Sequence, residues 1–274
     1  MMTDEDRKNL GPLGILASPC DENQTGKERR MRVYAFMVKA MVACVLASTG
    51  TLRSEPVPDG KGTATLPDSS VYNGEFRNGL FNGRGTLIRR DGVQYEGDFK
   101  DGLQHGQGVI SSRTYTYQGS FSNGLFQGKG VLTQSSGQKY EGEFADNAYN
   151  GKGMLTRRNG DRYEGEFKDG LAQGKGILTY GTGDRYDGEF SDNNFNGTGV
   201  LTQANGDRYV GDFKDNRFHG KGTLTYAAGG AYDGEFKVGT FDGKGGFVYA
   251  NGKKLEGMWE HGSFKDGDQK RQRQ

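Results

Sequence analysis

One repeated unit occupies most of the sequence, and its period restricts the fold more than any other feature. The repeat frame Tyr-x-Gly-x-Phe-x-x-Gly-x-x-x-Gly-x-Gly begins eight times, at Tyr72, Tyr95, Tyr117, Tyr140, Tyr163, Tyr186, Tyr209 and Tyr232. Successive copies start 23 residues apart, except for one step of 22 residues from Tyr95 to Tyr117. A ninth, degenerate copy starts at Leu255, and residues 60–62 are the end of a truncated first copy. Such units cannot bury their own apolar side chains, so each must pack on its neighbours.

Each copy is expected to form a β-hairpin. Tyr72, Gly74 and Phe76 alternate with polar residues, which is the period of a strand. Several glycines in a copy would destabilise a helix by about 1 kcal/mol each. The third residue after each phenylalanine is Gly or Asn, and pairs such as Asp91-Gly92 mark a second turn between copies. The sequence therefore predicts an all-β, continuous antiparallel meander over residues 59–267.

The aromatic residues at the first and fifth positions of the repeat frame are expected to share one face of this sheet. Rings of adjacent copies would then stack in columns, and their burial would contribute about 25 cal/mol per Å². The glycine between the two rings leaves room for a neighbouring ring. The predicted core consists of Tyr72, Phe76, Tyr95, Phe99, Tyr140, Phe144, Tyr163, Phe167, Tyr186, Phe190, Tyr209, Phe213, Tyr232 and Phe236.

A third column of aromatic residues follows the Gly/Asn turn and is interrupted by Gln104 and Ala172. Two interpretations are open for it. The rings could insert into a membrane interface or bind a partner, or they could fold back and cap the core between copies. The candidate partner or membrane contacts are Phe81, Phe126, Tyr149, Phe195, Phe218 and Phe241.

The charges of the chain are balanced, with 36 basic and 35 acidic residues and a formal net charge of +1. This balance argues against nucleic-acid binding, which needs a basic surplus on one face. The residue before the phenylalanine is acidic in seven of eight copies, and the residue within Gly-x-Gly is basic in six of eight. Neighbouring columns of this kind predict cross-strand ion pairs, each contributing on the order of a few tenths of a kcal/mol.

The segment before the repeats has a different pattern. Residues 1–30 are polar and are expected to form a disordered extension, whereas an apolar run from Val33 to Ala47 follows a basic stretch. This pattern is typical of a signal peptide. We therefore expect a helical signal peptide or membrane anchor over residues 31–48 and a linker over residues 49–58. A lipoprotein signal at Cys44, an amphipathic helix that packs on the repeats, and Met31 as the true start are the alternatives. Residues 268–274 are expected to be a basic tail.

The repeat has the form of a known motif. The unit over residues 163–170, Tyr-Glu-Gly-Glu-Phe-Lys-Asp-Gly, with Gly-Lys-Gly at residues 174–176, resembles the MORN repeat (membrane occupation and recognition nexus). Eight full copies match, with partial copies at both ends, although Phe stands where the family often has Trp. The resemblance implies an elongated, curled, single-layer sheet that is solenoid-like. It also implies scaffolding, dimerisation and phospholipid or membrane association.

The sequence does not predict a reaction site. His105, His219 and His261 are isolated, and the Gly-x-Gly pairs lack the strand-to-helix setting of a nucleotide site. We therefore expect a non-enzymatic scaffold or interaction protein without a cofactor or metal. It would be exported (periplasm, envelope or secreted) or membrane-associated through its N-terminal segment, with a cytoplasmic location as the alternative.

The partners expected from these patterns are an unidentified protein, membrane lipid and a second copy of the chain. A homodimer is expected because a single-layer sheet leaves an apolar face and two end strands uncovered. The alternative function is binding of phospholipid or cell-envelope glycan through the aromatic face or the loop edge.

Overall fold

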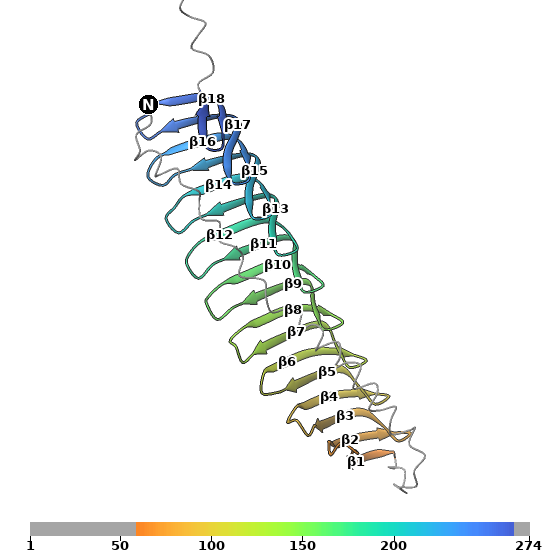
Figure 1. Cartoon of the computed structure of the whole chain (residues 1–274). Helices are drawn as coiled ribbons and strands as arrows, with labels where there is room; N and C mark the ends of the chain where they lie inside the picture. The colour runs from red at the N-terminus through yellow and green to blue at the C-terminus, as the bar shows by residue number, and fades with distance from the viewer. Residues whose placement is uncertain (1–58, 266–274) are drawn as a thin grey trace, which may run out of the picture. The chain divides into compact units, whose positions relative to one another are not determined.

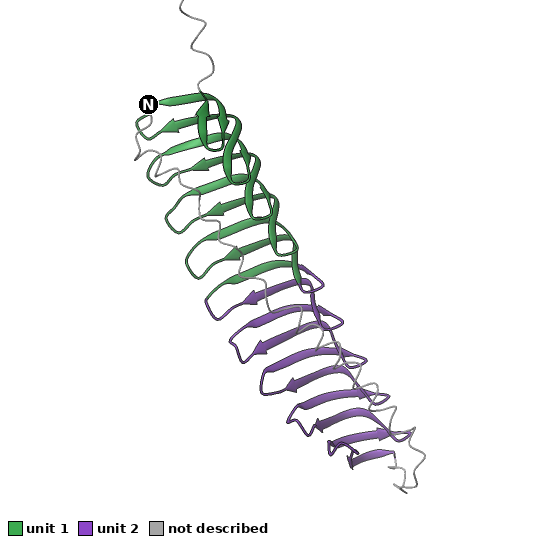
Figure 2. Cartoon of the chain, in the orientation of Figure 1, with its two compact units in different colours: residues 1–20, 160–166, 171–274 green, residues 21–159, 167–170 purple. Residues whose placement is uncertain are grey.

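The structure, a computed structural model, describes residues 59–265, and every regular element in this part of the chain is a β-strand (Figure 1). The all-β prediction is therefore confirmed for these residues. The predicted N-terminal helix, the linker and the basic tail lie outside the described residues. The chain divides into two compact units (Figure 2), and their described parts are residues 160–166 with 171–265 in unit 1, and residues 59–159 with 167–170 in unit 2.

Unit 2 is an antiparallel meander in which each strand pairs with the next along the chain. Its strands are β1 (Gly60–Thr65), β2 (Val71–Arg77), β3 (Leu80–Ile88), β4 (Gln94–Lys100), β5 (Leu103–Ser111), β6 (Tyr115–Ser122), β7 (Leu125–Gln134), β8 (Lys139–Ala145) and β9 (Ala148–Thr156).

Unit 1 repeats the same arrangement, with antiparallel pairing between successive strands from β11 onward. Its strands are β10 (Arg162–Lys168), β11 (Leu171–Thr179), β12 (Arg185–Ser191), β13 (Asn194–Thr202), β14 (Arg208–Lys214), β15 (Arg217–Thr225), β16 (Gly230–Lys237), β17 (Thr240–Tyr249), β18 (Lys254–Glu260) and β19 (Ser263–Lys265). The last two residues of β10 are grouped with unit 2.

The hairpin turns follow the predicted Gly/Asn column. Both central residues of each turn have positive φ, as Asn78 (52°) and Gly79 (73°) do. This is the type I′ geometry, whose twist matches that of the flanking strands. One turn breaks the chemical rule, because Val238 takes a φ of 52° although it is β-branched. The Gly/Asn column is therefore turn chemistry, as the sequence predicted.

The glycines of the repeat frame make space for the tyrosine ring. Gly74 pairs with Gly85 across β2 and β3, and a Cβ added to Gly85 would lie 2.5 Å from Cε2 of Tyr72. Real Cβ atoms essentially never approach another heavy atom so closely. The ring therefore lies across both glycines, and the Tyr72 hydroxyl donates to the carbonyl oxygen of Glu75 at 2.9 Å.

The core is a series of packed rings. Tyr72 makes edge contacts with Phe76 of its own copy at 5.0 Å and with Phe99 of the next copy at 5.1 Å. This geometry is the favourable one for aromatic pairs. All of the predicted core tyrosines and phenylalanines are at most 5% exposed, and so are Tyr117 and Phe121 of the remaining copy. The degenerate last copy has Trp259, 2% exposed, at the phenylalanine position.

Candidate functional site

The loop aromatic residues lie in the core. The exposed fractions of Phe81, Phe126, Tyr149, Phe195, Phe218 and Phe241 are between 5% and 9%. Each ring stacks on the tyrosine of its own copy, as Phe81 does on Tyr72 at 3.8 Å and Phe195 on Tyr186 at 3.7 Å. Of the two interpretations of this column, the placement matches the one in which the rings cap the core. A contact surface would require these rings to be exposed, and in this structure they are not.

The buried tyrosine hydroxyls are poor acids. Burial raises the pKa of Tyr72 to about 12, and burial also raises the pKa of the other repeat-frame tyrosines above the ordinary value. Each of these hydroxyls donates to a backbone carbonyl three residues later in its own copy. These groups are therefore neutral at physiological pH and are engaged in holding the hairpin.

The acidic column has a different main partner from the one predicted. The register places Arg84 opposite Asp98, and the two form an ion pair with Nε and Oδ1 3.5 Å apart. Asp98 also accepts the backbone N–H of Gln107 at 3.0 Å, and Asp212 likewise accepts that of Lys221 at 3.1 Å. The acidic side chains of several copies lie against the positive-φ glycine of their own hairpin. The acids thus hold the backbone of the hairpin in addition to facing the basic column.

The titratable side chains do not form a catalytic group in the part of the chain that the structure describes. His105 and His219 occupy equivalent positions, opposite Asp98 and Asp212 respectively. Between residues 59 and 265 there is no group of three or more His, Cys, Asp or Glu side chains that could hold a metal ion. The same residues include no helix long and apolar enough to span a membrane.

The copy that begins at Tyr95 departs from the repeat frame in two places. Gln104 stands where a loop ring is expected, so among the described rings Tyr95 has only edge contacts, with Phe99 and Phe121 at 5.0 Å each. The turn after β5 is one residue shorter than the others and closes with a hydrogen bond of 2.8 Å from the Ser112 N–H to the Tyr115 carbonyl.

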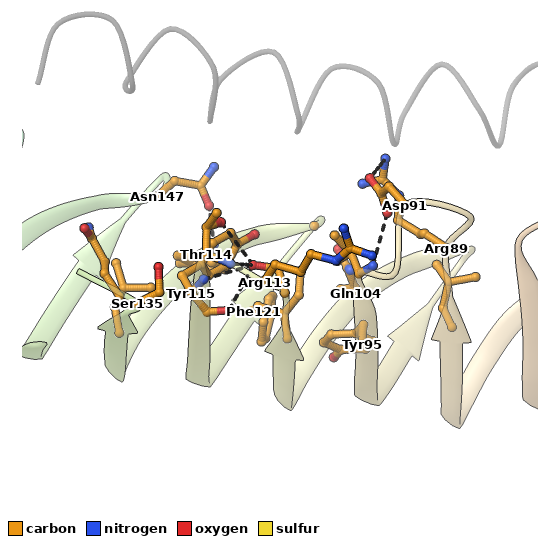
Figure 3. Close-up of a pocket in the computed structure, with 18 of the residues that line it drawn as sticks. Arg89, Asp91, Tyr95, Gln104, Arg113, Thr114, Tyr115, Phe121, Ser135 and Asn147 are labelled. Carbon is orange, nitrogen blue, oxygen red and sulfur yellow. Dashed lines mark hydrogen bonds and ion pairs between the residues drawn. The ribbon is translucent and has the colours of Figure 1, made fainter. Parts of the chain in front are cut away.

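Both departures line one pocket of about 530 Å³ in unit 2 (Figure 3). Its buried side is apolar and aromatic, formed by Tyr95, Phe121, Phe126 and Leu132. Its exposed side carries polar residues of neighbouring loops, among them Arg113, Thr114 and Ser135. An apolar interior with a few polar groups at the mouth is the common form of a binding pocket, and the volume falls within the usual range of about 300–1,000 Å³.

Gln104 and Arg113 are polar side chains at the pocket that lack a partner among the described residues. Gln104 is 8% exposed as a residue and makes no side-chain hydrogen bond to any of residues 59–265, but its amide atoms reach solvent, because no fully buried side-chain N or O atom in these residues lacks a partner. Arg113 is exposed and makes no ion pair within the same range. By contrast, Arg89 pairs with Asp91 at 3.2 Å, and Asp91 also accepts the Val93 N–H at 3.1 Å. Gln104 and Arg113 are therefore two of the polar groups available to a ligand.

The second interruption of the loop column is accommodated differently. Ala172, in unit 1, is 6% exposed, and the loop that follows β11 carries Tyr180, whose ring is 9% exposed. The equivalent loop position after Gln104 is Ser112, which has no ring to bury. Only the copy that begins at Tyr95 thus combines the loss of a loop ring with a small residue in the following turn.

Both signals of the pocket are present in the sequence. The 22-residue step and the Gln104 interruption are visible in the repeat alignment, but sequence reasoning treated them as separate irregularities. They fall on the same side of the sheet only when the hairpin is folded. A coincidence of two breaks in one copy is therefore a signal that could have identified the pocket.

Comparison with known proteins gives one clear match. The model of the MORN repeat matches eight consecutive segments, residues 72–94, 95–116, 117–139, 140–162, 163–185, 186–208, 209–231 and 232–254. None of the curated proteins compared with the chain matches its sequence.

Among solved structures, the chain is similar to the TCP10 domain of Danio rerio CPAP, with 12% identity, coverage of 72% of this chain and 94% of that chain, and a TM-score of 0.39. It is also similar to the SAS-4 TCP domain of Drosophila melanogaster, solved with a proline-rich motif of Ana2, with 11% identity, coverage of 77% and 97%, and a TM-score of 0.32. TM-scores this low do not establish a common overall fold.

Proposed function

Since the chain belongs to the MORN repeat family, whose repeats build scaffold and interaction modules, we propose that it is a non-enzymatic scaffold that holds protein partners against its repeats. One observation carries this proposal. The recurrent tyrosines, phenylalanines and glycines of the repeat frame already make contacts inside the fold. Their rings pack on one another, and the tyrosine hydroxyls donate to backbone carbonyls. What distinguishes one copy from another is therefore on the exposed faces and at the pocket, where a partner can be recognised.

The exposed faces are suited to contact rather than to chemistry. Alternate residues of the strands are solvated and charged, and ion pairs such as Lys139–Glu141 (3.1 Å) and Arg185–Asp187 (2.8 Å) lie along single strands. Their side chains are about half exposed, so each pair adds little to stability. Charges that contribute little to folding can instead select a partner by electrostatic complementarity.

We further propose that the scaffold is exported or attached to a membrane through residues 31–48. The basic stretch and the apolar run of the sequence support this proposal. Cell fractionation and mass spectrometry of the mature amino terminus test it. An amino terminus at or near Ser48, or full-length chain in the membrane fraction, is the expected result. Soluble protein with an intact Met1 would contradict both forms of the proposal.

Binding of phospholipid or cell-envelope glycan through the loop edge has less support. The loop rings that would enter a lipid interface or stack on a sugar are at most 9% exposed. Residues 59–269 contain 25 basic and 28 acidic residues, so the repeats offer no basic surplus to anionic lipid. Flotation of the repeats with anionic vesicles at low salt would be the result in favour of the lipid alternative.

Site-specific photo-cross-linking tests the scaffold proposal directly. A photoreactive amino acid is placed, one position at a time, at exposed sites such as Ile88, Val210 and Val248 of the full chain in the cells that produce it. We expect a small set of proteins that recur at particular positions and are absent at others. Adducts that merely follow protein abundance at every position would contradict the proposal.

A further inference from the structure

We propose that the pocket of the copy that begins at Tyr95 binds an extended segment of a partner protein in which an aromatic side chain is adjacent to an acidic residue. This inference rests on the proposed scaffold function and names the chemistry of the partner. Three features of the pocket carry it: a missing ring, a solvent-accessible amide that has no partner among the described residues, and an unpaired cation.

The missing ring defines the side chain that the pocket accepts. In the copy before it, Phe81 stacks on Tyr72 at 3.8 Å, and in the copy after it, Phe126 stacks on Tyr117 at 3.7 Å. Gln104 leaves Tyr95 without such a ring among the described residues. An aromatic side chain supplied by a partner would meet the same aromatic surroundings that the chain's own rings meet in those two copies, and aromatic pairs of this geometry are favourable.

The amide of Gln104 defines the backbone chemistry of the ligand. A primary amide offers two N–H donors and a carbonyl acceptor. The Gln104 side-chain amide has no partner within residues 59–265, and its atoms reach solvent at the pocket, where a ligand can bond to them. A peptide group carries one donor and one acceptor and can satisfy both sides of that amide. A peptide segment therefore fits the pocket better than an aromatic molecule without an amide.

The charge at the rim defines the neighbouring residue. Among the described residues, the charged ones that line the pocket are Arg89, Asp91 and Arg113. Arg89 and Asp91 pair with each other, which leaves the guanidinium of Arg113 as the unpaired charge. A guanidinium binds a carboxylate through two parallel hydrogen bonds, so an acidic residue beside the inserted aromatic residue complements the rim. The Ser135 hydroxyl is available on the same rim for the ligand backbone, whereas the Thr114 hydroxyl lies 3.3 Å from the Ser112 hydroxyl, with which it is hydrogen-bonded.

The test uses a capped peptide, acetyl-Gly-Phe-Asp-Gly-amide, titrated into the isotope-labelled full chain and followed by the NMR shifts of backbone amides. We expect saturable shifts at Thr114 and Ser135 and at other pocket residues. Peptides with Ala in place of Phe, or Lys in place of Asp, should bind at least about tenfold more weakly, since each loses one of the two recognition elements.

Variants of the chain separate this site from the rest of the surface. Gln104→Phe supplies the missing ring from the chain itself and should abolish binding without unfolding the protein. Arg113→Gln should weaken binding of the acidic peptide about threefold to tenfold and reduce its preference over the Lys-containing peptide. The matched control is Arg90→Gln, because Arg90 occupies the equivalent position of the preceding loop, is exposed and does not line the pocket. This control should bind the peptide as the unchanged chain does.

Several outcomes would overturn the inference. They are the absence of shifts at the pocket, equal binding by the Gln104→Phe variant, and equal binding of the Lys-containing peptide. Phenylacetate that binds more tightly than the capped peptide would overturn the assignment to a peptide. If the pocket residues show no NMR shifts while cross-links recur at other positions, only this inference is refuted. Peptide binding without recurrent cross-links would refute the scaffold proposal and leave the pocket assignment intact.

Discussion

The steric role of the frame glycines can be tested at two adjacent residues of β17. Gly245→Ala places a Cβ against the Tyr232 hydroxyl and 2.5 Å from Cζ of the same ring. The ring cannot move away easily, because it stacks on Phe241 at 3.8 Å and meets Phe236 at 5.1 Å. In Gly246→Ala the nearest atom to the new Cβ is Cγ of Glu256 at 3.4 Å, which is ordinary contact.

The two substitutions should therefore change stability in opposite directions. Overpacking costs about 1–3 kcal/mol, and displacement of the Tyr232 hydroxyl from the Glu235 carbonyl costs about 1 kcal/mol more. Ala gives the unfolded chain less conformational entropy than Gly does, and this offsets about 0.5 kcal/mol of the lost stability. We expect a loss of about 2–3 kcal/mol for Gly245→Ala and a gain of about 0.5 kcal/mol for Gly246→Ala.

Urea unfolding of the two variants, followed by circular dichroism, measures this difference. Both variants alter one strand and add one methyl group, so each is the control for the other. If their free energies of unfolding differ by less than about 0.5 kcal/mol, the tyrosine ring does not need the glycine beneath it, and the reasoning is refuted.

Three further predictions concern single features of the fold. Val238→Asn should raise the free energy of unfolding by about 1 kcal/mol, because Asn tolerates the φ of 52° better than a β-branched residue, and no gain in thermal stability would contradict this. Tyr186→Phe should cost about 1 kcal/mol, because the Glu189 carbonyl loses its 2.9 Å hydrogen bond, and an unchanged urea midpoint would show that the bond contributes nothing. Raising the pH should unfold the protein, because burial raises the pKa values of Tyr72 and Tyr232 from 10.0 to about 12. The stability that these two tyrosines contribute is therefore complete below pH 10 and is lost between pH 10 and about 12. Each such tyrosine should remove up to about 1.4 kcal/mol per pH unit in that window, and urea midpoints that agree at about pH 9 and about pH 11 would contradict the assignment.

Most of the fold could be predicted because a single steric requirement selects the residue type at each position of the repeat frame. Positive φ selects Gly or Asn at the turn, and the pair Asn78-Gly79 shows both central residues in that region. The alternation of Tyr72, Gly74 and Phe76 sets the face of the core. These constraints are local, and each of them recurs in eight copies of the repeat, so a single irregular copy does not obscure the pattern.

The pocket and the partner of the acidic column could not be predicted in the same way. Glu75 and its equivalents oppose a basic column in the sequence pattern, but whether a carboxylate meets a side chain or a backbone N–H depends on the local bulge of the hairpin. The pocket depends on where Gln104 and the short turn after Ser111 meet in space. The sequence marks the copy in which both irregularities occur, but only the folded register shows that they meet at one pocket and which group each carboxylate contacts.

The claim on which the site depends is that Gln104 occupies the place of a missing core ring. The free energy of unfolding of Gln104→Phe tests it most directly. Stacking of the new ring on Tyr95, as Phe81 stacks on Tyr72 at 3.8 Å, should stabilise the chain by about 1–2 kcal/mol. A variant that is equally stable or less stable would mean that Gln104 does not occupy the position of a core ring, and the assignment of the site would be wrong.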